Sequence, residues 1–354
     1  MTAVSPPSPM STEVDLAPLA ALASRWLPGG EGPFECQVMP GGASTRRYFR
    51  VRRGPVSAVA MYVPDGTKAE EVVHGSPARA RWPFLEVRDL LASRGVDVPA
   101  LLAEDTARGW LLIEDLGDET LAAYLAAHPD AREALYVGAV TGLARAQAAL
   151  RELPAGSIVA SRAFDEDLLL WELHHFREWV LDARGCALEP AARARFDGIA
   201  GRLAARIAGW PRVFVHRDYQ SRNLMVRSGG ELCWLDFQDA LLGPRIYDVV
   251  ALLNDSYQVF DRPFVEARID DYARAAGIAG EGRAVLGREF DLVTVQRKLK
   301  DAGRFIFIDR VKGNPSFLRF VEPTLAKARA SLARLADDED MRALTEVLSG
   351  ALPA

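Results

Sequence analysis

Lysine, cysteine and long apolar runs are all scarce in this 354-residue sequence. Only three cysteines occur, far apart and without CxxC spacing, which argues against a disulfide framework or a zinc site. No stretch approaches the roughly 18 consecutive apolar residues that span a bilayer. Residues 1–13 lack the basic start and apolar core of a signal peptide. We therefore expect a cytoplasmic protein with no membrane partner.

Arginine supplies nearly all of the positive charge, because only five lysines occur. The net charge of -5 at pH 7 gives no reason to expect a nucleic-acid partner. Charged residues make up 26% and hydrophobic residues 49% of the chain, which is typical of a globular protein. Its length exceeds that of one ordinary domain and favours two packed lobes.

The first third of the chain is rich in β-type sequence. Residues 34–63 contain short β-rich runs separated by Gly, Pro and Ser turns. A helix fits residues 81–93 and a strand fits residues 110–117. From residue 118 onward apolar residues recur at helical spacing, which predicts mostly helix, with segments at 118–129, 130–153, 165–185 and 189–210.

This organisation predicts an α+β protein with a small β-rich N-lobe and a larger, mostly helical C-lobe. We expect a mobile tail at residues 1–13, the N-lobe at 14–113, a hinge at 114–117 and the C-lobe at 118–354. A cleft between two such lobes is a natural place for a ligand.

One β-rich island, residues 212–237, interrupts the helical part and carries the most informative residues. It reads RVFVHRDYQSRNLMVRSGGELCWLDF. Two strands flank the Gly-Gly pair at 229–230, which is a favoured two-residue hairpin loop. That loop pairs Met225 with Trp234 and places Asn223 directly opposite Asp236.

Asn223 and Asp236 offer the amide and carboxylate oxygens that Mg²⁺ prefers, and Asp218 on the preceding loop can reach the same spot. In phosphoryl transfer a metal offsets the phosphate charge, while an Asp accepts the proton of the attacking hydroxyl. The string also matches the kinase pattern H-R-D-x-x-x-x-N followed by D-F, with Gln in place of the final Gly. We expect Asp218 to be the catalytic base and Asn223 and Asp236 to be the metal ligands. We interpret His216 as a residue that braces the loop rather than one that transfers protons, and Asp248 as a helix-capping or loop-bracing group rather than a ligand.

These motifs resemble the aminoglycoside phosphotransferase family, which has a protein-kinase-like fold. The resemblance runs from about residue 14 to about residue 348. LLIEDLG looks like the hinge of that family, which implies that the backbone around Glu114 and Leu116 binds adenine. GGAST looks like the loop that covers the phosphates of ATP. The implied nucleotide contacts in and after this loop are Gly41, Gly42, Ser44, Thr45 and Arg46.

A narrower similarity is to the bacterial anomeric sugar kinases of cell-wall recycling. It is carried by HRDYQSRNLM, DFQDALLGPRIYDVVALLNDSY, QRKLKDAGRFIFIDR and GGASTRRYFR. Those enzymes phosphorylate N-acetylmuramate and N-acetylglucosamine at the anomeric hydroxyl, so the resemblance implies an amino-sugar substrate, ATP and Mg²⁺. Two alternatives stay open: a kinase for an aminoglycoside, a choline-like alcohol or another sugar, and a non-catalytic nucleotide-binding module. We expect a monomer, although no sequence feature fixes the oligomeric state.

The N-lobe departs from the kinase pattern at the phosphate-binding Lys. Met61 stands at the expected position, and the nearest lysine, Lys68, lies beyond a proline. An arginine is one replacement, because its planar guanidinium suits phosphate oxygens. Arg46 and Arg47 follow the GGAST loop directly. The alternative is an impaired kinase that only binds nucleotide.

Basic residues gather in the segment after residue 295. Arg297, Lys300 and Arg304 share helical spacing, so they form either a basic face for an anionic substrate or a solvated helix face. Glu172 stands among aromatic residues, where it either binds sugar hydroxyls or packs in the core. Gln220 and Arg222 lie beside the base, where they contact either the substrate or the γ-phosphate, and bracing of the loop is a further alternative for Arg222. The substrate candidates are Gln220, Arg222, Glu172, Arg297 and Arg304.

Overall fold

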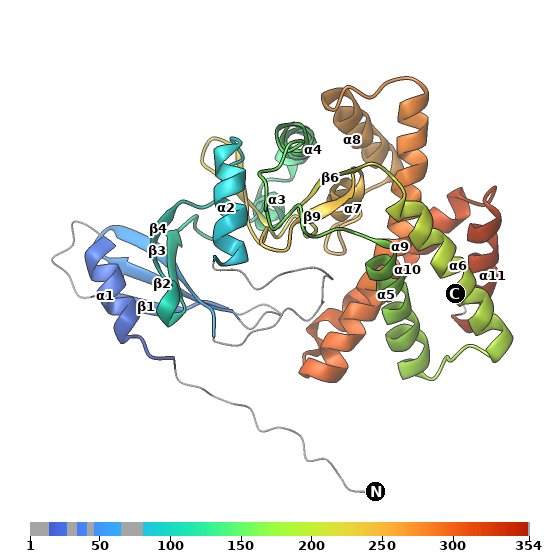
Figure 1. Ribbon diagram of the computed structural model, residues 1–354, viewed down its shortest axis with the longest axis horizontal. Coiled ribbons are helices and arrows are strands. Elements are labelled where there is room, and N and C mark those ends of the chain that lie inside the picture. Colours follow the sequence, from blue (N-terminus) through green and yellow to red (C-terminus); the bar gives the residue numbers. More distant parts are fainter. Residues whose placement is uncertain (1–13, 27–33, 41–45, 65–80, 353–354) are drawn as a thin grey trace, which may run out of the picture. The chain divides into compact units, whose positions relative to one another are not determined.

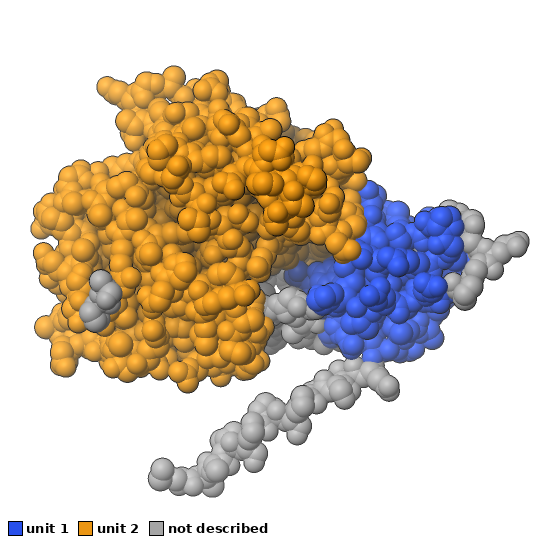
Figure 2. Space-filling view, turned by 180° about the vertical axis from the view of Figure 1, so that it is seen from behind, with its two compact units in different colours: residues 1–70, 99–115 blue, residues 71–98, 116–354 orange. Residues whose placement is uncertain are grey.

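The computed structural model describes residues 14–26, 34–40, 46–64 and 81–352. The chain forms two compact units, which Figure 2 shows in different colours. Unit 1 comprises Met1–Glu70 and Pro99–Asp115, and unit 2 comprises Glu71–Val98 and Leu116–Ala354. The final passage between the units falls between Asp115 and Leu116, inside the segment predicted as a hinge. One unit is built on a sheet and the other is mostly helical, which confirms the predicted α+β class.

Unit 1 is built on a five-stranded antiparallel sheet with the strand order β1-β2-β3-β5-β4. Helix α1 (Ala17–Trp26) lies against this sheet (Figure 1). Neither α1 nor β4 was predicted from the sequence, whereas the other four strands were. The strands are β1 (Glu35–Val38), β2 (Arg47–Arg53), β3 (Val56–Tyr62), β4 (Leu101–Asp105) and β5 (Trp110–Glu114).

The register of β2 on β3 decides which side chains share a face of the sheet. Phe49 pairs with Ala60, and both belong to the hydrophobic core that includes Leu19 of α1. Tyr48 pairs with Met61, which is therefore on the opposite face, because successive residues of a strand alternate. The Met61 side chain is fully buried.

Unit 2 contains ten α-helices in the described part of the chain, and the long α9 contacts α5, α7, α8 and α10 (Figure 1). The predicted helical segments are confirmed. None of the helices in the described residues combines the length and apolar character needed to cross a membrane. The helices are α2 (Pro83–Ser93), α3 (Leu121–Ala127), α4 (Arg132–Ala149), α5 (Glu166–Phe176), α6 (Pro190–Ala208), α7 (Tyr247–Leu253), α8 (Arg262–Ala275), α9 (Glu281–Lys312), α10 (Val321–Arg334) and α11 (Glu339–Ala351).

Helix α2 clusters with the helical unit, whereas we expected it in the N-lobe. Its Phe84 ring stacks on Phe237 with 5.0 Å between ring centroids. The Glu86 carboxylate accepts a hydrogen bond of 2.6 Å from the Ile158 backbone N–H. These contacts attach α2 to Phe237, at the end of the β-rich island, and to the segment between α4 and α5.

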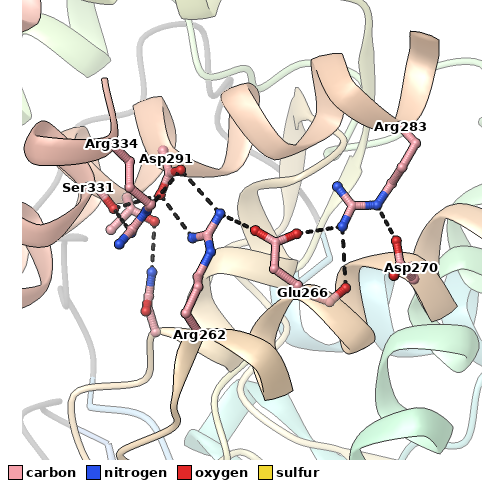
Figure 3. Close-up of polar contacts among 9 residues, drawn as sticks. Arg262, Glu266, Asp270, Arg283, Asp291, Ser331 and Arg334 are labelled. Atoms are coloured by element: carbon pink, nitrogen blue, oxygen red, sulfur yellow. Dashed lines mark hydrogen bonds and ion pairs between the residues drawn. The ribbon is translucent and has the colours of Figure 1, made fainter. Parts of the chain in front are cut away.

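A chain of alternating charges joins α8, α9 and α10 (Figure 3). At its centre the buried Asp291 of α9 accepts hydrogen bonds from Arg334 at 2.7 Å and from Arg262 at 3.1 Å. Glu266 lies between Arg262 and Arg283 (Figure 3). Because one carboxylate binds two arginines, removing it would leave two cations facing each other.

Two antiparallel sheets of two strands each hold the candidate site in unit 2. Strand β6 (Arg212–Val215) pairs with β9 (Leu241–Pro244), and β7 (Leu224–Val226) pairs with β8 (Leu232–Trp234). The loop between β6 and β7 carries residues 216–223, so both ends of this loop are fixed by strands.

Candidate active site

The loop between β6 and β7 is braced at its start by Asp248, in the first turn of α7. Its carboxylate, which is fully buried, accepts hydrogen bonds from the backbone N–H of His216 at 2.6 Å and of Arg217 at 3.0 Å. Burial raises the pKa of Asp248 to about 7, although the two backbone donors oppose that shift. Arg217 adopts a left-handed backbone conformation with φ 79°. The interpretation of Asp248 as a loop brace is confirmed.

A second carboxylate, Asp255, braces the other half of this loop and was not singled out from the sequence. It is fully buried and accepts hydrogen bonds from the Ser221 backbone N–H at 3.0 Å and from the Ser221 hydroxyl. Its other oxygen accepts from the Tyr257 backbone N–H at 2.9 Å. Asp255 therefore joins the loop to the segment that follows α7.

Asp218 and Asn223 lie within a compact turn. The Asn223 amide nitrogen donates to the backbone oxygen of Asp218 at 2.8 Å, and the Gln220 N–H donates to the same oxygen at 2.9 Å. Because the amide nitrogen of Asn223 is used inside the loop, its oxygen is the atom suited to a cation. The Asp218 side chain is 37% exposed, so its carboxylate can meet a ligand.

The predicted register of the β7–β8 hairpin is wrong by one residue. Met225 pairs with Cys233, and the Leu235 N–H donates to the Asn223 oxygen at 2.8 Å, so Leu235 rather than Asp236 is opposite Asn223. The register differs because the loop contains three residues, 228–230, instead of two. Gly230 has φ 85°, and its N–H donates a hydrogen bond to the backbone oxygen of Arg227. A type I turn followed by a left-handed Gly is the usual three-residue hairpin loop.

Asp236 nevertheless remains at the same end of the hairpin as Asn223. It follows Leu235 directly and has φ 59°, an uncommon backbone conformation for a residue other than Gly. Its carboxylate accepts a hydrogen bond of 2.8 Å from the Gln238 amide, so the Gln of the D-F-Q string orients it. The left-handed turn, rather than cross-strand pairing, therefore sets the direction of this carboxylate.

Arg297 of α9 contacts the loop between β6 and β7. Its fully buried guanidinium donates to the backbone oxygen of Arg217 at 2.9 Å and lies 3.6 Å from the Asp218 carboxylate. Burial alone would raise the pKa of Asp218, but the positive charges of Arg297, Lys300 and Arg217 outweigh it and lower that pKa. The carboxylate of Asp218 is thus kept in the ionised form that a base requires.

The basic segment of α9 is not a solvated face. Arg297, Lys298 and Lys300 are all buried, so that alternative is wrong for these residues. Lys298 binds Asp301 at 2.7 Å, and Lys300 lies 3.8 Å from Glu172 of α5. Glu172 is itself fully buried, and its pKa is raised by burial although Lys300 opposes this shift.

The remaining substrate candidates lie in different settings. Arg304 is partly exposed, and its guanidinium lies 5.0 Å from the centre of the Phe307 ring. Gln220 is partly exposed within the loop. Arg222 is exposed, and its guanidinium lies 3.5 Å above the Tyr257 ring. These positions do not test whether the residues contact a substrate, so the predicted substrate contacts stay predictions.

The predicted nucleotide contacts of unit 1 are described only in part. Gly41, Gly42, Ser44 and Thr45 lie outside the described residues. Arg46 immediately precedes β2. At the end of β5, the Glu114 backbone N–H donates to the Ala100 oxygen at 2.9 Å. Leu116 begins the final stretch of unit 2.

Two arginines near Met61 differ in the face they occupy. Arg47 pairs with Tyr62, and its guanidinium lies 5.6 Å from the centre of the Phe49 ring, on the α1 face of the sheet. Strand alternation assigns Arg50 to the opposite face with Met61, where it forms an ion pair of 2.9 Å with Asp115.

The comparisons with known proteins agree with this geometry. Residues 35–286 match the model of the phosphotransferase enzyme family. The chain belongs to this family. Among the relatives of this phosphotransferase, the N-acetylmuramate/N-acetylglucosamine kinase of Pseudomonas aeruginosa is 35% identical over 328 residues, covering 89% of this chain and 90% of the relative. The enzyme of the same name from Neisseria meningitidis is 32% identical over 333 residues, covering 88% and 93%.

Solved structures support the fold of the phosphotransferase. A choline kinase from Cryptosporidium parvum has a TM-score of 0.62 at 12% identity, covering 94% of this chain and 100% of that chain. An ADP-bound aminoglycoside phosphotransferase has a TM-score of 0.53 at 15% identity, covering 84% and 94%. At such low identity these likenesses show the kinase-like fold alone.

Proposed function

We propose that this protein transfers the γ-phosphoryl group of ATP to the anomeric hydroxyl of N-acetylmuramate and N-acetylglucosamine, in peptidoglycan recycling. The relatives from Pseudomonas aeruginosa and Neisseria meningitidis carry both sugars in their names. The observation that best supports a working kinase is the setting of Asp218. Its carboxylate is 37% exposed, while buried Asp248, Asp255 and Arg297 fix the loop around it. A positioned, ionised carboxylate is suited to general-base catalysis.

In the proposed reaction Asp218 accepts the proton of the anomeric hydroxyl. The sugar oxygen forms a bond to the γ-phosphorus, the bond from that phosphorus to the bridging oxygen breaks, and ADP leaves. Arg297 holds the loop backbone at Arg217, so the carboxylate keeps its direction while the proton moves. Gln220 and Arg222, on the same loop, are the nearest candidates to contact the acceptor.

The oxygen donors at the open end of the β7–β8 hairpin fit Mg²⁺. Asn223 and Asp236 would hold it, because Mg²⁺ is usually bound by one or two protein oxygens together with substrate phosphates. Among the described residues no group of three or more His, Cys, Asp or Glu side chains forms a metal site without such help. When bound, the cation offsets the charge of the phosphates.

For the nucleotide, we propose that the backbone of Glu114 and Leu116 binds adenine and that residues 41–46 cover the phosphates. Met61 favours a second candidate function, nucleotide binding without catalysis, because this buried side chain supplies no cation at the usual Lys position. Arg46 is proposed to take the place of that lysine.

A substrate panel tests this proposal. The protein is mixed with ATP, with and without Mg²⁺, and with N-acetylmuramate, N-acetylglucosamine, kanamycin or choline, and ADP release is measured. We expect Mg²⁺-dependent turnover of the two amino sugars, a 1-phosphate product by ³¹P NMR, and a loss of about 100- to 10,000-fold in kcat for Asp218→Asn. Turnover of kanamycin or choline alone would exclude the amino-sugar role, and tight ATP binding without turnover would favour the second candidate.

A further inference from the structure

The two proposed acceptors differ in one charged group. N-acetylmuramate carries a lactyl ether with a carboxylate, whereas N-acetylglucosamine has a hydroxyl at that position. A site that prefers the acidic sugar therefore needs a cation that is exposed and not already neutralised by the protein. The inference below rests on the proposed function.

Most cations close to Asp218 do not meet that requirement. Arg297 is fully buried between Arg217 and Asp218, and Lys298 is buried against Asp301. Lys300 is buried and lies 3.4 Å from Asp301. Each of these charges is compensated by a carboxylate inside unit 2, so none is offered to a ligand.

Arg222 differs from all of them. It belongs to the same loop as Asp218, it is exposed, and its guanidinium lies 3.5 Å from the centre of the Tyr257 ring. The Tyr257 ring in turn meets Phe320 edge-on, with 4.9 Å between ring centroids. An arginine stacked on an aromatic ring keeps the edge of its planar guanidinium available for a bidentate carboxylate.

Asp255 ties the loop next to Arg222 to the segment that carries Tyr257. One oxygen of that carboxylate holds Ser221, which directly precedes Arg222, and the other holds the Tyr257 backbone under the guanidinium. The loop and the ring are therefore parts of one frame. A guanidinium held in this way loses little conformational freedom when it binds an anion.

We propose that Arg222 binds the carboxylate of the acidic acceptor sugar and thereby favours N-acetylmuramate over N-acetylglucosamine. Tyr257 is the positioning residue for this contact, because it supports the guanidinium from one side. Arg304 is the competing cation, since it is partly exposed on α9 and stacks on Phe307.

The test compares kcat/KM for both sugars in the full-length protein. For Arg222→Gln we expect the ratio of the two kcat/KM values, N-acetylmuramate over N-acetylglucosamine, to fall about tenfold, with KM for ATP close to that of the wild type. Arg319→Gln is the matched control. Arg319 is an exposed arginine like Arg222, and its guanidinium also lies over an aromatic ring, 4.8 Å from the centre of Phe320, but it is outside the loop that carries Asp218. The selectivity of Arg319→Gln should equal that of the wild type.

A second pair of variants keeps the Arg222 guanidinium and changes the Tyr257 ring on which it lies. Tyr257→Phe retains the ring and should retain selectivity, whereas Tyr257→Leu should lower it toward that of Arg222→Gln. KM for N-acetylmuramate should also rise with salt in the wild type and do so less in Arg222→Gln, because salt screens an exposed ion pair.

Several outcomes would overturn the inference. An equal loss for both sugars, or a raised KM for ATP, would assign Arg222 to the phosphates or to loop structure. Lost selectivity in Arg304→Gln with unchanged selectivity in Arg222→Gln would assign the carboxylate to Arg304. Absence of turnover of both sugars by the wild type would overturn the proposed function and this inference together, which a loss confined to the variant would not do.

Discussion

Replacing Asp255 by Asn should damage catalysis more than it damages folding. The carboxylate accepts three hydrogen bonds, from the Ser221 N–H, the Ser221 hydroxyl and the Tyr257 N–H. An amide keeps only one accepting oxygen, and its NH₂ group then faces a backbone N–H. Since a hydrogen bond to a charged group contributes about 1.5–3 kcal/mol, we expect a total cost of about 2–4 kcal/mol.

The site of this cost decides what is measured. Because the bonds hold the loop that carries Asp218, most of the cost should fall on the ordered state of this loop, and kcat/KM should fall by about 30- to 700-fold. The assay is steady-state turnover below the melting temperature, run beside guanidinium denaturation. Ser221→Ala, which keeps the backbone bond and loses only the hydroxyl, should have a smaller effect.

Asp291→Asn is the matched control for Asp255→Asn. Asp291 is also a buried, multiply bonded carboxylate, but it joins α8, α9 and α10 rather than the loop (Figure 3). Weakening the ion pairs of Asp291 with Arg262 and Arg334 should lower the free energy of unfolding by about 3–5 kcal/mol and leave kcat/KM within about twofold of the wild type. The reasoning is refuted if Asp255→Asn keeps wild-type kcat/KM, or if both variants lose activity equally.

Two further predictions concern the nucleotide and acid stability. If Arg46 replaces the missing lysine, Arg46→Gln should raise KM for ATP or lower kcat by about 10- to 100-fold. Arg47→Gln, on the α1 face of the sheet, should change KM for ATP and kcat little. Equal effects of the two variants would contradict the assignment of Arg46 to the phosphates. Burial, with help from the positive charges of Arg304 and Lys300, lowers the pKa of His175 to about 4. As pH falls from about 6.5 to 4, the unfolded chain therefore binds a proton that the folded chain does not. The free energy of unfolding should drop over this range by at most about 3 kcal/mol. His175→Phe should flatten this part of the stability curve, whereas His128→Phe at an exposed site should not.

Features set by neighbouring residues in the chain could be predicted from the sequence. The two strands that flank the Gly-Gly pair, and the bracing role of Asp248, follow from local patterns that the structure confirms, whereas β9 was not predicted. The assignment of Asp218, Asn223 and Asp236 to catalysis and metal binding stays a prediction. Their shared location at one end of a hairpin is consistent with it.

The hairpin register shows where local reasoning fails. A Gly-Gly pair allows both a two-residue and a three-residue loop, and the choice depends on which glycine takes the left-handed conformation. Gly230 takes it, and the extra loop residue moves every pair by one position. The left-handed backbone of Asp236 keeps its carboxylate at the same end of the hairpin as Asn223, and a hydrophobic period in the sequence does not predict such a backbone conformation.

The burial of the α9 cations could not be predicted for a different reason. Helical spacing identifies residues that share a face, but it does not say what covers that face. Glu172, which compensates Lys300, comes from α5, more than a hundred positions earlier in the chain. Asp255 was missed in the same way, because its partner Ser221 belongs to a separate element.

The left-handed backbone of Arg217 has a consequence for attempts to make this protein more heat-resistant. A residue with a Cβ pays about 1–2 kcal/mol to adopt that conformation, and Gly does not. Arg217→Gly would relieve that cost, but it would also remove a buried guanidinium that lies 3.7 Å from the Glu172 carboxylate and contributes positive charge near Asp218. Glycine at this position would therefore exchange a small gain in backbone freedom for a less compensated buried carboxylate, so the strained backbone is not a simple target for stabilisation.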